Sequence, residues 1–204
     1  MLPRPQLVVF DLGGVLVSFD ETPLYTVFRP EVDHAVWWDF VLHHPAFRGF
    51  ETGTFSTGEM ARVAVRDLCR DGVDVPEFLA QLSRWPEEPF PGARECVERV
   101  RKSGIPTAML SNTNPLHWGI LRPKFADLFG TTFLSFETGF LKPDPQAFAP
   151  VEAATGFAGD QILFFDDNLR NIEAATSRGW NAVQVRGPAD VNAVLDAMEW
   201  AVKA

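Results

Sequence analysis

Short runs of apolar residues alternate with amphipathic stretches over most of this chain. The run Leu7–Phe10 lacks polar alternation, which predicts a central strand covered on both faces, as in a parallel sheet. Shorter or similar runs at 106–110, 131–136, 161–165 and 181–185 predict further strands, with helices between them. Strands that alternate with helices of this length form parallel sheets with helices on both faces. The expected fold class is therefore α/β, with a doubly wound parallel sheet.

Residues 18–90 depart from this alternation and have mostly helical patterns. Apolar positions at helical spacing predict helices over 31–44, 57–70 and 76–85. The proline-rich segment that follows, PEEPFPG, is typical of a hinge or domain boundary. We therefore expect a core domain of residues 1–17 and 91–204 and an inserted helical domain of residues 18–90. The alternative is one continuous helical layer of the core.

Composition and charge narrow the possible partners. The chain has 204 residues, 46% of them apolar, which is enough for a packed core with a small insertion. The net charge is −9 and no basic run occurs, which disfavours nucleic acid and anionic membranes as partners. No stretch approaches 18 consecutive apolar residues, and the amino terminus lacks a long apolar region. With two lone cysteines, these features favour a cytoplasmic location.

Candidate chemistry lies where three of the predicted strands end. Polar residues follow these strands, and the carboxyl ends of parallel strands meet at one edge of the sheet. The residues are Asp11, Ser111, Asn112, Asp166 and Asp167, with Lys142 in a loop between the second and third strands. A carboxylate can act as a nucleophile, and two carboxylates with further oxygen ligands suit Mg²⁺. A hydroxyl and backbone N–H groups can hold a phosphate, whose charge a lysine offsets.

Four ordered motifs identify a family resemblance. F-D-L-G-G-V, L-S-N-T-N, L-K-P-D-P and F-F-D-D-N-L-R-N-I resemble, in order, the four motifs of the haloacid dehalogenase (HAD) superfamily. The segment F-E-T-G-T-F-S-x-x-E-M, followed by F-P-G-A, resembles the helical C1 cap of subfamily I. The resemblance covers essentially the whole chain. It is strongest to the small sugar-phosphate phosphatases of the glucose-1-phosphatase type.

The resemblance implies a role for each residue of the site. Asp11 would be the nucleophile that attacks phosphorus. Ser111 and the amide of Asn112 would bind a phosphate oxygen, and Lys142 would bind and stabilise the aspartyl-phosphate. These roles describe a phosphomonoester hydrolase acting on a small phosphorylated metabolite.

The metal ligands also follow from the resemblance. Asp11, the backbone carbonyl of Gly13 and Asp167 would hold Mg²⁺. We align Asp167 with the metal ligand because Asn171 then falls where the family often has a second acid. Asp166 would lie behind it or be the alternative ligand.

Position 13 departs from the family pattern. Most phosphatases of this family carry there an aspartate that serves as general acid and base, a role worth ~10²–10⁴-fold in rate. Gly13 cannot supply it. Three outcomes stay open: hydrolysis that favours good leaving groups, a substitute such as His117 or water, or a binding protein without turnover. A 2-haloacid dehalogenase is a further alternative, which the paired acids at 166 and 167 disfavour.

Substrate selection is expected from the cap. Arg48 lies in the segment AFRGFE between two predicted helices, where it could contact substrate. Phe47 and Phe50 beside it suit either a substrate contact or the core of the cap. The sequence does not choose between a monomer and a homodimer.

Overall fold

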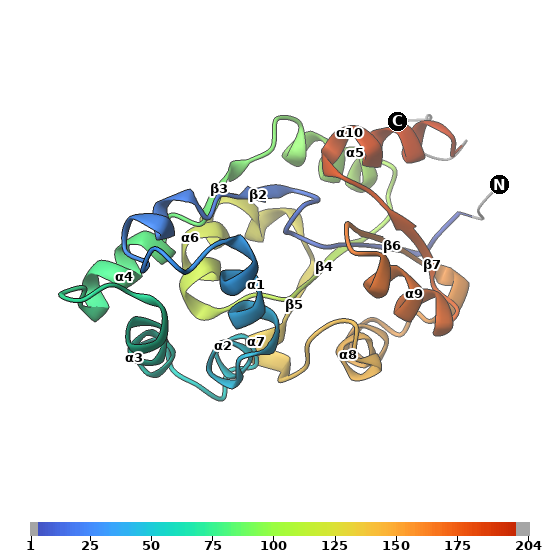
Figure 1. Ribbon diagram of the computed structural model, residues 1–204. Helices are drawn as coiled ribbons and strands as arrows, with labels where there is room; N and C mark the ends of the chain where they lie inside the picture. Colours follow the sequence, from blue (N-terminus) through green and yellow to red (C-terminus); the bar gives the residue numbers. More distant parts are fainter. Residues whose placement is uncertain (1–3, 199–204) are drawn as a thin grey trace.

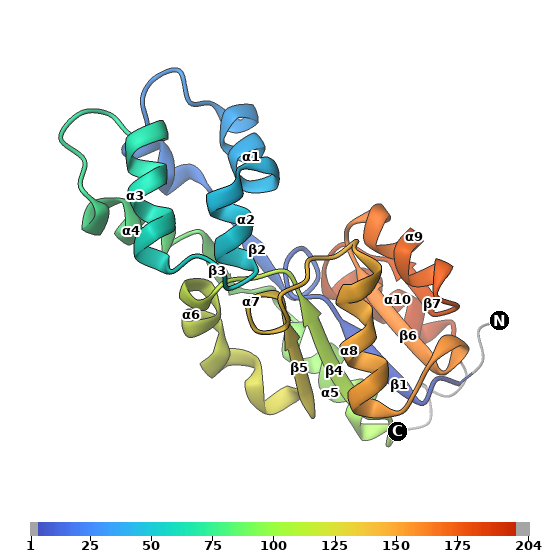
Figure 2. The ribbon, with the colours of Figure 1, turned by 90° about the horizontal axis from the view of Figure 1, so that it is seen from below.

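A five-stranded parallel sheet forms the centre of the protein in a computed structural model that describes residues 4–198. The strand order is β5-β4-β1-β6-β7, and every neighbouring pair is parallel. Figure 1 shows the whole molecule, and Figure 2 labels all five strands of the sheet. The strands are β1 (Leu7–Phe10), β4 (Thr107–Ser111), β5 (Thr131–Leu134), β6 (Ile162–Asp166) and β7 (Asn181–Gln184). The predicted α/β fold with a parallel sheet is confirmed.

Helices cover both faces of this sheet. One face packs against α5 (Ala93–Lys102), α6 (Pro115–Phe125) and α10 (Gly187–Asp196), and the other against α8 (Pro145–Thr155) and α9 (Leu169–Ser177). In β1, Val8 and Phe10 enter the first core, whereas Leu7 and Val9 enter the second. Because side chains alternate between the faces of a strand, a strand buried on both sides is apolar throughout.

The chain from β2 to β3 forms a second group of elements, which we call the cap. Strands β2 (Val17–Phe19) and β3 (Pro86–Pro89) pair as an antiparallel ribbon. Between them lie α1 (His34–His43), α2 (Pro45–Glu51), α3 (Thr57–Leu68) and α4 (Val75–Leu82). These helices pack around a core of their own, which includes Trp37, Phe47 and Phe78, and Figure 2 shows them together beyond one end of the sheet. The boundaries of the cap at residues 18 and 90 stay a prediction.

The segment PEEP, predicted to be part of a hinge or domain boundary, pairs with residues 17–19 as strand β3, and its role as a boundary stays a prediction. Two local predictions were wrong. Residues 45–51 are helical, starting at Pro45, with the Ala46 amide donating to Nδ1 of His44. Residues 135 and 136 belong to the short helix α7 (Ser135–Thr138) and not to β5. Here Ser135 Oγ bonds to both the amide and the carbonyl of Thr113, which draws the chain back toward the end of β4.

Three 3₁₀ helices complete the described elements: Thr22–Thr26, Ala126–Leu128 and Gly159–Gln161. In the part of the chain from residue 4 to residue 198, no helix has the length and apolar character needed to cross a bilayer.

Candidate active site

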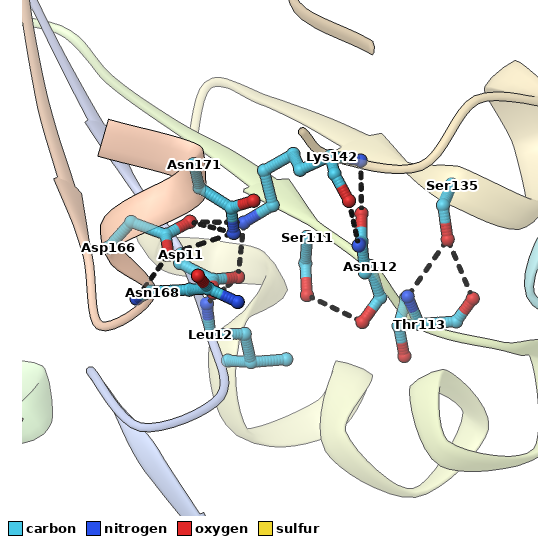
Figure 3. Close-up of polar contacts among 10 residues, drawn as sticks. All are labelled: Asp11, Leu12, Ser111, Asn112, Thr113, Ser135, Lys142, Asp166, Asn168 and Asn171. Atoms are coloured by element: carbon cyan, nitrogen blue, oxygen red, sulfur yellow. Dashed lines mark hydrogen bonds and ion pairs between the residues drawn. The ribbon is translucent and has the colours of Figure 1, made fainter. Parts of the chain in front are cut away.

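The predicted strand ends meet at a cavity of about 260 Å³ that lies between the sheet and the cap. Asp11, Asn112, Lys142 and Asp167 line it from the core. These side chains come from four separate segments of the chain, and the parallel sheet brings them to one edge (Figure 3 draws three of them). The cap contributes the opposite wall.

Asp11 follows β1 directly and is held in one orientation. Its Oδ1 accepts the Leu12 amide at 2.7 Å and lies 2.9 Å from the Lys142 ammonium. No described residue donates a hydrogen bond to its Oδ2, which is therefore free for chemistry. Burial raises the pKa of Asp11 to about 7; the Lys142 charge opposes this rise, and the neighbouring carboxylates add to it.

Lys142 is a buried cation placed between two carboxylates. Its Nζ lies 2.9 Å from Asp11 and 2.6 Å from Asp166. Burial alone would lower the pKa of Lys142, but Asp11 and Asp166 together raise it, so the side chain stays charged. The Asn112 side chain fixes the loop: its Nδ2 donates to the Lys142 carbonyl at 2.9 Å, and its Oδ1 accepts the Lys142 amide at 2.8 Å.

The two adjacent acids at the end of β6 have different surroundings. Asp166 is fully buried, and its oxygens accept hydrogen bonds from Lys142, from the Asn171 side chain and from the Asn168 amide (Figure 3). Asp167 is more exposed, and no side chain among residues 4–198 donates to its carboxylate. This asymmetry favours Asp167 as the metal ligand and Asp166 as the residue that orients Lys142.

The donor set fits a hard divalent cation. Carboxylate oxygens of Asp11, Asp166 and Asp167 all lie within 4.8 Å of one another. Asn171 donates through Nδ2 to Asp166, which leaves its buried Oδ1 without a partner. The Gly13 carbonyl also receives no hydrogen bond from the described residues. Oxygen-only sites of this kind suit Mg²⁺.

Gly14 makes room for one of these carboxylates. Its φ is +67°, in the left-handed region that favours glycine. A Cβ atom at this position would lie 2.3 Å from Oδ2 of Asp167. The second glycine of the first motif is therefore required both by the backbone and by the close approach of Asp167.

His117 lines the cavity but has no free ring nitrogen. Nδ1 accepts a hydrogen bond from the Asn114 side chain at 3.0 Å, and Nε2 donates to the Leu82 carbonyl at 3.1 Å. Burial lowers the pKa of His117 to about 4, so the ring is neutral near pH 7. It joins α6 to the end of α4 and does not present an acidic proton to the cavity.

Two predicted substrate contacts lie outside the cavity wall. Ser111 is buried, and its Oγ makes a long 3.4 Å hydrogen bond to the Asn112 carbonyl; the wall beside it is formed by Asn112 and Thr113. Arg48 is exposed, and its guanidinium donates to the Leu42 carbonyl at 3.2 Å. Their roles in substrate binding stay predictions.

The cap residues that do line the cavity were missed from the sequence. Glu51 ends helix α2, three residues after Arg48, and Phe19, Trp38 and Trp85 stand near it. Pro45 was the available signal, because proline is favoured in the first turn of a helix. Phe47 and Phe50 are fully buried in the core of the cap.

Comparisons with known proteins agree on the family. Residues 5–179 match the model of the haloacid dehalogenase-like hydrolases. D-ribitol-5-phosphate phosphatase from Bacteroides thetaiotaomicron is 27% identical over 194 residues, which cover 90% of this chain and 93% of that protein. Acyl-CoA dehydrogenase family member 10 from Mus musculus is 26% identical over 211 residues, covering 94% of this chain but 19% of that protein.

A solved structure shows the same fold. A HAD family enzyme from B. thetaiotaomicron, in complex with magnesium and inorganic phosphate, matches with a TM-score of 0.75 at 23% identity, covering 88% of this chain and 93% of that one. The superfamily predicted from the four motifs is confirmed, while the subfamily and the type of cap stay predictions. The chain is a hydrolase that belongs to the haloacid dehalogenase-like family.

Proposed function

We propose that this protein is a Mg²⁺-dependent phosphomonoester hydrolase that forms an aspartyl-phosphate at Asp11. One observation carries the proposal: Asp11 has one oxygen held by Leu12 and Lys142 and the other free, beside the carboxylate of Asp167. A nucleophile with a fixed orientation beside a permanent cation suits attack on phosphorus. The substrate would be a small phosphorylated metabolite such as a sugar phosphate.

In the first step, the free oxygen of Asp11 attacks phosphorus and the bond from phosphorus to the leaving oxygen breaks. The Lys142 ammonium offsets negative charge on the phosphoryl oxygens, and Ser111 and the Asn112 amide would hold one of them. In the second step, water attacks the same phosphorus and the bond to Asp11 breaks, which restores the carboxylate and releases phosphate. When bound by Asp11, Asp167 and the Gly13 carbonyl, Mg²⁺ would neutralise phosphoryl charge.

The leaving oxygen departs with an electron pair and must gain a proton. Gly13 has no acid to give, and His117 is neutral with both nitrogens engaged. Water in the cavity is then the proton source. We expect this to favour leaving groups of low basicity, such as phenols or the anomeric oxygen of a sugar.

The comparisons support phosphoryl chemistry over the alternatives. One relative is named as a polyol phosphate phosphatase, and one structural neighbour holds magnesium and inorganic phosphate. The cluster of three carboxylates suits a metal ion, which dehalogenation, where the nucleophile attacks carbon, does not need. No observation favours a binding role without turnover.

The test is phosphate release from p-nitrophenyl phosphate and a panel of sugar phosphates, with Mg²⁺ and with EDTA. We expect release only with Mg²⁺, and a loss of more than about 100-fold in Asp11→Asn. Asp39→Asn is the matched control, because Asp39 is an exposed acid of helix α1 whose only ion pair with a residue in 4–198 is with His43. Undiminished release from Asp11→Asn would overturn the proposal.

A further inference from the structure

The wall that the cap contributes to the cavity is apolar and aromatic. It includes Phe19, Trp38, Leu42 and Trp85. The ring centroids of Phe19 and Trp85 are 5.6 Å apart, and those of Trp38 and Trp85 are 5.7 Å apart. Such a surface packs against the carbon skeleton of a leaving group. It offers no opposite charge to a charged substituent on that group.

No free cation faces this wall. Among the described residues that line the cavity, Lys142 is the only lysine or arginine. Its ammonium is already shared by Asp11 and Asp166, and its side chain is 1% exposed. Arg48, on the same cap helix as Glu51, donates to the Leu42 carbonyl and does not line the cavity.

Glu51 is the one polar group at the far side of the cavity that is available to a ligand. It is half-buried at the end of α2, and its carboxyl makes no hydrogen bond or ion pair with any residue in 4–198. Burial raises the pKa of Glu51 to about 8 against the opposing charge of Arg48. Near neutral pH the protonated carboxyl can therefore both donate to and accept from a hydroxyl group.

Among the described residues that form the wall contributed by the cap, a second anionic group on the substrate would find no lysine or arginine. It would lose water against the aromatic rings, and the protonated Glu51 carboxyl offers it a hydrogen bond but no opposite charge. A hydroxyl in the same place would meet the Glu51 carboxyl at no such cost. The cavity volume of about 260 Å³ suits a substrate with a few carbon atoms beyond the phosphate.

We propose that this cavity selects phosphomonoesters whose leaving group is small, uncharged and hydroxyl-bearing, and rejects those with a carboxylate or a second phosphate. This inference rests on the proposed phosphatase activity and names the substrate class of that same site. Glu51 and the aromatic wall are the residues that determine specificity.

A matched pair of substrates tests it. Glycerol 3-phosphate and 3-phosphoglycerate have the same three-carbon skeleton and differ in a hydroxymethyl group against a carboxylate. We expect kcat/KM with Mg²⁺ to be higher for glycerol 3-phosphate by about tenfold or more, since the wall gives the carboxylate of 3-phosphoglycerate no cation in exchange for the water it loses. Calorimetry on Asp11→Asn with Mg²⁺ gives the Kd of each compound. We expect glycerol 3-phosphate to have the lower Kd.

A pair of variants tests the cause. Leu42 and Val36 both lie on α1 and are 52% and 42% exposed, but only Leu42 lines the cavity. Leu42→Arg adds a cation to the wall. It should lower the ratio of kcat/KM for glycerol 3-phosphate to kcat/KM for 3-phosphoglycerate by about tenfold. Val36→Arg adds the same charge on the same helix outside the cavity, where solvent screens it, and should leave the ratio within about twofold.

The outcomes separate the two proposals. If p-nitrophenyl phosphate is hydrolysed but 3-phosphoglycerate is used and bound as well as glycerol 3-phosphate, the inference on specificity is overturned and the phosphatase stands. An unchanged ratio in Leu42→Arg would also count against it. If no ester is hydrolysed, the proposed function fails, and the Kd ratio still decides whether the cavity discriminates against the second charge.

Discussion

The ring of Phe19 fills the space that any side chain at position 13 would need. A Cβ atom on Gly13 would lie 2.5 Å from Cε2 of Phe19, far closer than two non-bonded carbon atoms approach. Phe19 belongs to β2, so the first motif and the strand that enters the cap are in direct contact. A side chain at position 13 would therefore require the ring of Phe19 to move.

The first prediction follows from this contact. Gly13→Asp alone should lower stability by about 1–3 kcal/mol, because the new side chain overpacks against Phe19. Gly13→Asp with Phe19→Ala should accept the acid and raise kcat for alkyl phosphates by about tenfold or more, while p-nitrophenyl phosphate changes little. Urea unfolding and steady-state kinetics measure the two effects. Phe19→Ala alone is the control, and an equal gain in that variant would contradict the role of the acid.

The second prediction concerns Gly14. Gly14→Ala should lose stability through its left-handed backbone and through the contact with Asp167, and its affinity for Mg²⁺ should fall by about tenfold. Gly72→Ala is a matched control: its φ is +88°, but an added Cβ would have no neighbour within 4 Å. That variant should lose only about 1–2 kcal/mol, with Mg²⁺ binding unchanged. Calorimetric Mg²⁺ titration and urea unfolding distinguish the two variants. Equal Mg²⁺ affinities would contradict the role of Gly14 in making room for Asp167.

The third prediction separates the adjacent acids. Asp167→Asn should weaken Mg²⁺ binding by about tenfold or more and leave the fold intact, because its carboxylate is bound by no described side chain. Asp166→Asn should instead destabilise the protein by about 3 kcal/mol, since it removes a buried partner of Lys142 and an acceptor for Asn171. Mg²⁺ titration and urea unfolding of both variants give the comparison. The reverse pattern would make Asp166 the ligand.

The fourth prediction concerns pH. Burial raises the pKa of Glu51 from 4.5 to about 8, so between these values the folded state holds a proton that the unfolded chain releases. The stability that Glu51 contributes is complete below pH 4.5 and is lost as pH rises through 8. Glu51→Gln cannot ionise, so the variant lacks this loss. The unfolding free energy of the variant minus that of the wild type should therefore increase between pH 5 and pH 9. Parallel profiles of the two proteins in urea would contradict the shift.

Local patterns were sufficient for the sheet and for most of the site. The strands of the core are unbroken apolar runs, because both faces are buried, and this is visible in any one of them. The residues that end those strands carry the four motifs, so Asp11, Asn112, Lys142 and Asp167 could be named before any geometry was known. A parallel sheet then places them at one edge without further information.

Residues that are neighbours in the sequence have different surroundings that no local pattern predicts. Asp166 and Asp167 are adjacent in the sequence. The carboxylate of Asp166 accepts hydrogen bonds from Lys142, Asn171 and the Asn168 amide, whereas Asp167 lines the cavity. Arg48 and Glu51 share one helix turn, yet the acid lines the cavity and the arginine faces solvent. The amino-acid pattern was enough for the fold class and for the residues that end the strands, because burial on both faces makes each strand an unbroken apolar run. The lining of the cavity depends on how the cap packs against the core. It brings together residues as far apart in the sequence as Glu51 and Asp167, and no local pattern encodes that contact.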